Sequence, residues 1–161
     1  MPLGIGVIRG HGKVMKHRSV SEMVRDQVVI SLPPDATARE AARVMADRRI
    51  GAVLITQDGL LLGIFTERDM VARVVALGRD PDHTELSAVM TAKPRTVDHG
   101  ASTPEALRTM QQGGFRHLPV TKRGRIAGIL SLRDFASSDL LEIERAQDLE
   151  RAIAEGGLPS G

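Results

Sequence analysis

Two seven-residue segments place a hydroxyl and a carboxylate three residues apart at the start of a predicted helix. They are residues 63–69 (GIFTERD) and residues 128–134 (GILSLRD), and both begin with glycine. The three-residue spacing puts both groups on one side of the first helical turn. Acidic residues so placed commonly accept the hydroxyl protons of a ribose, and a helix N-terminus with adjacent arginines suits phosphate. The pattern is that of a candidate nucleotide site.

The same pattern has a purely structural interpretation. A hydroxyl followed three residues later by a carboxylate is also a capping box, which only starts a helix. The chain has two further capping boxes, at residues 37–40 and 102–105, and both use glutamate. Aspartate is shorter and reaches the cap N–H less well, so the use of Asp69 and Asp134 here indicates a role other than capping. On the residues alone, both interpretations stay open.

The two segments belong to an internal duplication. Residues 35–69 align without gaps on residues 100–134, and the identical pairs cluster at turns and helix starts. Upstream, Met23 aligns with Met90 at a shifted spacing. Each copy predicts the order strand, helix, strand, strand, helix. One such unit is too small to bury both faces of its sheet, so the two copies are expected to pack together.

Capping and turn signals place the elements of each copy. Thr37 and Ser102 open the central helices, and Asp-Gly at residues 58–59 predicts a hairpin. The glycine of each signature allows another group to approach the backbone closely. The expected segments are short helices at 20–24 and 86–90, strands at 28–31 and 95–97, hairpins at 52–64 and 117–130, and closing helices that start at Thr66 and Ser131.

The two halves resemble consecutive CBS domains. In that family the last strand and helix carry glycine, an apolar residue, any residue, Thr or Ser, any two residues, then Asp or Asn. Residues 115–120 (FRHLPV) also resemble the family's second strand, and Met23 and Met90 stand where the family often has methionine. The likeness covers about residues 20–136. It implies an α+β fold with two CBS β-α-β-β-α repeats packed with pseudo-twofold symmetry.

The resemblance implies two clefts that bind an adenosine-containing regulatory ligand: an adenine nucleotide (AMP, ADP or ATP) or S-adenosylmethionine. Asp69 and Asp134 would hold ribose hydroxyls, with Thr66 and Ser131 beside the ribose or phosphate. Backbone groups would face the base, and arginines would contact the phosphates. The residues so implied are Gly51, Ala52, Val53, His117, Leu118 and Pro119 for the base, and Arg49, Arg68, Arg116 and Arg133 for the phosphates.

The first copy departs from the family pattern. It has Val53-Leu54 where the second copy has Leu118-Pro119. The second cleft therefore matches the family's adenine-binding pattern more closely and is the stronger candidate. One occupied site is as compatible with the sequence as two.

The composition excludes several function classes. Among 161 residues there is no Cys, which excludes disulfides and thiolate sites. Aromatic residues make up 2%, so the stacking of single-stranded bases is disfavoured. The formal net charge is only +2. Because no nucleophile elbow, Walker loop or metal cluster is present, we expect a binding module rather than an enzyme.

The remaining expectations concern organisation and partners. We expect a flexible basic arm at 1–19, CBS domains at 20–77 and 86–136 joined by a linker at 78–85, a C-terminal helix at 137–155 and a disordered tail at 156–161. Without a signal or membrane segment, a cytoplasmic location is expected. The resemblance implies a homodimer that acts on an effector protein. The alternatives are a structural or interaction module with empty clefts and, last, nucleic-acid binding through the basic arm.

Overall fold

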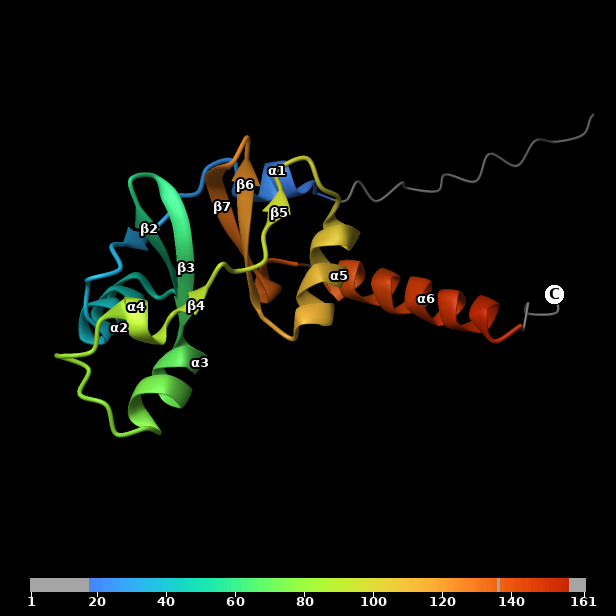
Figure 1. Cartoon of the computed structure of the whole chain (residues 1–161). Coiled ribbons are helices and arrows are strands. Elements are labelled where there is room, and N and C mark those ends of the chain that lie inside the picture. Colours follow the sequence, from blue (N-terminus) through green and yellow to red (C-terminus); the bar gives the residue numbers. More distant parts are fainter. Residues whose placement is uncertain (1–17, 136, 157–161) are drawn as a thin grey trace, which may run out of the picture.

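A computed structural model describes residues 18–135 and 137–156 as an α+β structure with two sheets (Figure 1). The first part of the chain forms short helix α1, a sheet built around the β2–β3 hairpin, and the helices that cover it. Its elements are α1 (Val20–Val24), β1 (Ser31–Leu32), α2 (Ala38–Arg48), β2 (Ala52–Gln57), β3 (Leu60–Thr66), α3 (Glu67–Asp69) and the π-helix η1 (Met70–Val75).

The second part repeats this order and ends in a long helix. Its elements are α4 (Leu86–Val89), β4 (Thr91–Ala92), β5 (Val97–Asp98), α5 (Thr103–Gly113), β6 (His117–Lys122), β7 (Arg125–Ser131), the 3-10 turn η2 (Leu132–Asp134) and α6 (Ser137–Ala154). Helix α6 leaves the second sheet and runs beside α5 (Figure 1).

The two sheets share one topology. In each, a short strand pairs in parallel with the first strand of a hairpin, β1 with β2 and β5 with β6, and the hairpin strands pair antiparallel. The ladder is interrupted at matching places, between Ile55 and Thr56 and between Val120 and Thr121. The predicted pair of β-α-β-β-α repeats is therefore confirmed, and the first sheet gains β4 as a fourth strand.

Both hairpins turn through a pair of left-handed residues. Asp58 and Gly59 have φ of 51° and 77°, and Arg123 and Gly124 have φ of 52° and 76°. Positive φ at both central residues is what a two-residue type I′ turn requires, and its twist matches that of the flanking strands. The hairpin prediction is confirmed in both repeats.

Three element boundaries differ from those expected. The strands expected at 28–31 and 95–97 begin later, as β1 and β5, and the Val28 side chain is mostly exposed. The closing helix expected from Ser131 is a single 3-10 turn, and the long helix starts only at Ser137. Phe135 is buried and has extended backbone, which breaks the helix between the two.

The short helix that precedes each repeat packs on the other repeat. Val20 and Val24 of α1 are buried in the core of the second sheet, whereas Leu86 and Val89 of α4 are buried in the core of the first. This exchange ties the repeats together, because neither core is complete without a helix that belongs in sequence to its neighbour.

The exchanged helices explain the glycine of each signature. A Cβ at Gly128 would lie 2.6 Å from Val24 Cβ, and one at Gly63 would collide with Met90. The close approach expected from these glycines therefore comes from α1 and α4. The sequence alignment of Met23 with Met90 is wrong in structural terms, because Val24 takes the place of Met90 in the second repeat.

A separate apolar layer joins the two sheets. Its buried residues are Ala52, Leu54 and Ile64, all from the β2–β3 hairpin. Ile126 and Ile129 of β7 pack against them from the other repeat. Because successive residues of a strand face opposite sides, β2 gives Val53 and Ile55 to its own repeat's core and Leu54 to this inter-repeat layer.

Candidate functional site

A cleft of about 1060 Å³ lies between the repeats, at the ends of the strands that carry the signatures. Its walls come from the end of α2, the start of β2, the first signature, the crossover at residues 91–95, the α5–β6 loop and the second signature. Gly51 lies close to the His117 imidazole, so the starts of β2 and β6 meet in its wall. The volume is that of a small-molecule site.

Asp69 is a buried polar group in the wall of the cleft. It is 9% exposed, and its Oδ2 accepts hydrogen bonds from the Thr66 N–H and the Thr66 hydroxyl, both at 3.0 Å. The Asp69 N–H donates to Thr66 Oγ1 at 3.2 Å. The capping box therefore exists, and it also holds the carboxylate in the cleft wall. The two interpretations of this pattern are compatible, because the box uses Oδ2, and Oδ1, which faces Arg73, can still accept a hydrogen bond from a ligand.

Arg73 positions this carboxylate from one turn further along the chain. Its Nε lies 3.5 Å from Asp69 Oδ1, and its Nη1 donates to the carbonyls of Val89 and Met90 at 3.2 and 2.8 Å. The guanidinium thus links the first signature to the end of α4, where unpaired carbonyls favour a cation. The arrangement fixes Asp69 to an element of the opposite repeat's sequence.

His117 lies in the cleft wall as a neutral base. Burial lowers its pKa below the ordinary 6.5, and Arg133 and Arg116 act in the same direction, whereas Glu67 and Asp134 oppose it. A neutral imidazole has one donor and one acceptor nitrogen. It can therefore exchange hydrogen bonds with a purine edge, which also presents both kinds of group.

Nine of the residues implied by the family pattern line the cleft, and five do not. Ala52, Val53, Leu118 and Pro119 are buried in the hairpins behind it, and among the described residues that line the cleft Asp134 is absent. The nine are Arg49, Gly51, Thr66, Arg68, Asp69, Arg116, His117, Ser131 and Arg133.

A group of wall residues lies outside both signatures and was not predicted from the sequence. The basic crossover Lys93-Pro94-Arg95 is the clearest of them, followed by Arg73 and Phe115. The charge of the crossover is visible in the sequence. Its position beside the first signature follows only from the exchange of α4 and from the pairing of β4 with β3.

The second signature is held by a bond within itself and by other parts of the chain. The Ser131 N–H donates to Asp134 Oδ2 at 2.7 Å, and Arg18 Nη2 donates to the Asp134 carbonyl at 2.9 Å. Beside it, the Gln27 amide bonds both backbone groups of Ile129, donating at 2.8 Å and accepting at 2.9 Å. Gln27 thus stands where β4 stands in the first repeat, so the two sides of the molecule differ.

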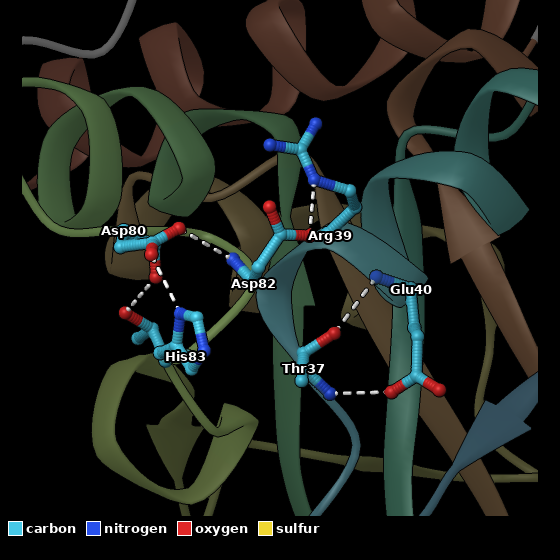
Figure 2. Close-up of polar contacts among 7 residues, drawn as sticks. Thr37, Arg39, Glu40, Asp80, Asp82 and His83 are labelled. Carbon is cyan, nitrogen blue, oxygen red and sulfur yellow. Dashed lines mark hydrogen bonds and ion pairs between the residues drawn. The ribbon is translucent and has the colours of Figure 1, made fainter.

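A second polar cluster lies at the far end of α2 (Figure 2). Arg39 pairs with Asp82 at 2.5 Å, and His83 Nδ1 lies 2.6 Å from Asp80 Oδ2. The loop also caps α2, because the N–H groups of Ala38 and Arg39 donate to carbonyls of residues 81–84. These bonds use the helix N-terminus internally, so the cluster is structural.

We predict that His83 gives the stability of the fold a pH dependence. The hydrogen bond to Asp80 raises the His83 pKa above 6.5 and lowers the Asp80 pKa below 3.8. The contribution of His83 is therefore full below pH 6.5 and is lost as the pH rises through its folded-state pKa. Urea denaturation should give wild type a higher free energy of unfolding than His83→Gln at about pH 5.5. At about pH 8.5 the two free energies should be equal. A difference in free energy of unfolding that does not change with pH would contradict the prediction.

The described residues contain neither a membrane-spanning helix nor a metal cluster. Among the described residues, no helix has the length and apolar character needed to cross a membrane. Within the same part of the chain, no group of three His, Asp or Glu side chains is arranged to hold a metal ion. The basic arm expected at residues 1–19 lies almost entirely outside the described residues.

Comparisons with known proteins agree with this architecture. The family model described as CBS domain matches residues 20–76 and 86–140. The CBS domain-containing protein CBSCBSPB2 of Arabidopsis thaliana is 38% identical over 126 residues, which are 78% of this chain and 24% of that protein. The chain thus spans about a quarter of that relative's length. The uncharacterized protein YlbB of Bacillus subtilis is 38% identical over 73% of this chain and 79% of its own length.

A solved structure has a similar fold over most of this chain. The CBS domain protein PAE2072 from Pyrobaculum aerophilum, complexed with AMP, superposes with a TM-score of 0.71 at 30% identity, covering 80% of this chain and 99% of that one. The duplicated signature, the matching sheets and these likenesses agree. The chain belongs to the CBS-domain family and contains two CBS domains.

Proposed function

We propose that this chain is a regulatory module that binds an adenosine-containing ligand, an adenine nucleotide or S-adenosylmethionine, in the cleft between its CBS domains. The observation that carries the proposal is the Asp69 carboxylate, held by Thr66 in the wall of a cleft of about 1060 Å³. A buried, fixed carboxylate beside free volume suits the hydroxyl pair of a ribose.

Further support comes from the other walls of the cleft. The neutral His117 and the backbone of Gly51 line the same cleft as Thr66, where a base would face polar groups. Arginines from both repeats provide phosphate contacts, and Arg133 Nη2 reaches the Arg49 carbonyl at 3.5 Å. The relative with the same fold was solved with AMP. The proposal is regulatory, since the wall residues named above are groups that bind a base, a ribose and phosphates.

Ligand binding would act on the arrangement of the two repeats. The cleft is built from both repeats, so a ligand that contacts both favours the geometry in which its contacts are complete. We propose that an effector protein reads this geometry. The energetic link is testable without the effector, because a ligand that binds only the folded state raises the thermal midpoint.

Isothermal titration calorimetry of the full chain with AMP, ADP, ATP and S-adenosylmethionine tests the proposal. We expect saturable binding of at least one ligand and a matching rise in the thermal midpoint. Absence of binding by all four would overturn the proposal in favour of an interaction module with empty clefts.

We also propose that the chain forms a homodimer. Val71, Val75 and Leu77, in and just after η1, are 62%, 66% and 63% exposed, which leaves three large apolar side chains uncovered in one short segment. Sedimentation velocity should show a dimer for wild type and a monomer for Val71→Asp with Val75→Asp. A wild-type chain that is monomeric at every concentration would contradict the proposal.

A further inference from the structure

We propose that the cleft selects adenosine ligands that carry a chain of two or three phosphates, and that it discriminates against AMP and S-adenosylmethionine. The inference rests on the proposed function and adds the chemical class of the ligand. It is carried by the charge of the cleft walls, by the backbone conformation of two of their cations, and by the asymmetry between the two repeats.

Cations outnumber carboxylates on the cleft walls by seven to two. Of the two carboxylates, Asp69 already faces Arg73. Within residues 18–135 and 137–156, the recorded ion pairs involve no other cation of the cleft. A single phosphate carries about two negative charges, which is fewer than these walls can neutralise. The cations are Arg49, Arg68, Arg73, Lys93, Arg95, Arg116 and Arg133.

Two of these cations occupy backbone positions that disfavour them. Arg49 and Lys93 have φ of 55° and 47°, in the left-handed region that residues with a Cβ rarely adopt. The second repeat has Gly114, with φ of 66°, where the first has Arg49. Glycine is the usual residue at such a helix end. The first repeat thus keeps a charged residue at a cost in stability, as expected when the charge serves a ligand.

The basic crossover is present on one side of the molecule only. When α1 and α4 are aligned at their first residues, residues 27–29 (QVV) correspond to residues 93–95 (KPR). Gln27 is bonded to Ile129, whereas Lys93 and Arg95 line the cleft. If the cations had only a general structural role, both copies would be expected to share them. Their restriction to the Asp69 side places the phosphate chain there.

Charge separates the possible adenosine ligands. Each additional phosphate brings more negative charge to the same basic walls, so affinity should rise from AMP to ADP to ATP. S-adenosylmethionine carries a sulfonium cation in place of phosphates, and like charge opposes its binding. The charge of the walls therefore predicts different affinities for these ligands, even though all of them contain adenosine.

Calorimetric titration of the full chain with AMP, ADP, ATP, S-adenosylmethionine and inorganic tripolyphosphate tests the ranking. We expect each phosphate beyond the first to tighten binding about five-fold, and S-adenosylmethionine to bind more weakly than AMP. Tripolyphosphate should bind more weakly than ATP, because it lacks the ribose that Asp69 holds. Raising NaCl from about 50 to about 500 mM should reduce the ratio of ATP affinity to AMP affinity, because salt screens exposed charges.

The crossover is tested by Lys93→Asn combined with Arg95→Gln. Asparagine tolerates the left-handed backbone at position 93, so the fold is preserved. ATP affinity should fall about ten-fold and AMP affinity much less. The matched control is Lys122→Asn with Arg125→Gln, which removes two exposed cations of the β6–β7 hairpin outside the cleft. The control should bind both nucleotides as wild type does.

Arg49→Gly provides a separate readout. It should weaken ATP binding and raise the thermal midpoint by about 3 °C, because glycine relieves the left-handed strain. Equal affinity for AMP and ATP, or equal loss of both in the crossover variant, would overturn the inference and leave the proposed function standing. Tripolyphosphate binding as tight as ATP would overturn the requirement for adenosine. Absence of binding by every compound would overturn both proposals.

Discussion

Replacing Gly128 with alanine is expected to lower the free energy of unfolding by about 3 kcal/mol, the largest stability effect that we predict for this chain. The added Cβ would lie 2.6 Å from Val24 Cβ, 2.7 Å from Val24 Cγ1 and 2.8 Å from Gln27 Oε1. Val24 Cβ is attached directly to the α1 backbone, so it cannot move unless the helix moves. The strain therefore falls on the exchanged helix that completes the core of the second repeat.

Two further glycines calibrate this prediction. Gly63→Ala meets the Met90 thioether, a flexible group that can rotate away, and the Thr91 backbone carbonyl at 2.9 Å, which cannot. Its cost should therefore be intermediate, about 2 kcal/mol. Gly100→Ala has one neighbour, Asp98 Oδ1 at 3.2 Å, and should change stability by less than about 0.5 kcal/mol. Urea denaturation of the three variants gives the order. If Gly128→Ala were no worse than Gly100→Ala, the packing of α1 on the second repeat would be contradicted.

The fold could be predicted from the sequence because its signals are local and occur twice. The left-handed hairpin turns follow from Asp58-Gly59 and from their counterpart at residues 123–124. The starts of α2 and α5 follow from capping by Thr37 and Ser102. Each of these signals acts over two to four residues. Because the chain is duplicated, a signal in one copy is supported by its counterpart in the other.

The exchange of α1 and α4 could not be predicted in this way. Neither helix carries a local signal for which of two similar sheets it covers, and the choice depends on chain direction through residues 25–30 and 91–96. The prediction that Gly63 and Gly128 allow another group to approach the backbone closely is confirmed. The approaching groups are Val24 and Met90, which only the three-dimensional arrangement identifies.

The candidate site was predictable only in part, for the same reason. Residues of the two signatures and the arginines near them line the cleft, because short motifs at strand ends keep their relative positions. Lys93 and Arg95 were missed because they follow an exchanged helix. From the sequence, the second cleft is the stronger candidate because it has Leu118-Pro119. The lining of the cleft favours the side of Asp69 instead, and ligand titration decides between them.

The second large effect is expected from the two signature aspartates, which should contribute unequally to binding. Asp69→Ala should weaken binding of the tightest adenosine ligand by about a hundred-fold. This follows because each hydrogen bond to a carboxylate contributes about 1.5–3 kcal/mol and each 1.4 kcal/mol is a factor of about ten. Asp134→Ala should leave the affinity within about two-fold, because Asp134 lies outside the described lining of the cleft. Calorimetry on both single variants measures the difference.

Loss of the capping box must be separated from loss of the ligand contact. Asp69→Ala also removes the bond to the Thr66 N–H, which alone should cost about 1 kcal/mol of stability. Glu40→Ala is the matched control. It removes the corresponding 2.7 Å bond to the Thr37 N–H at α2, away from the cleft. We expect Glu40→Ala to lose stability and keep full affinity. Equal loss of affinity in Asp69→Ala and Asp134→Ala would show two equivalent sites, and wild-type affinity in both would reduce the signatures to capping boxes.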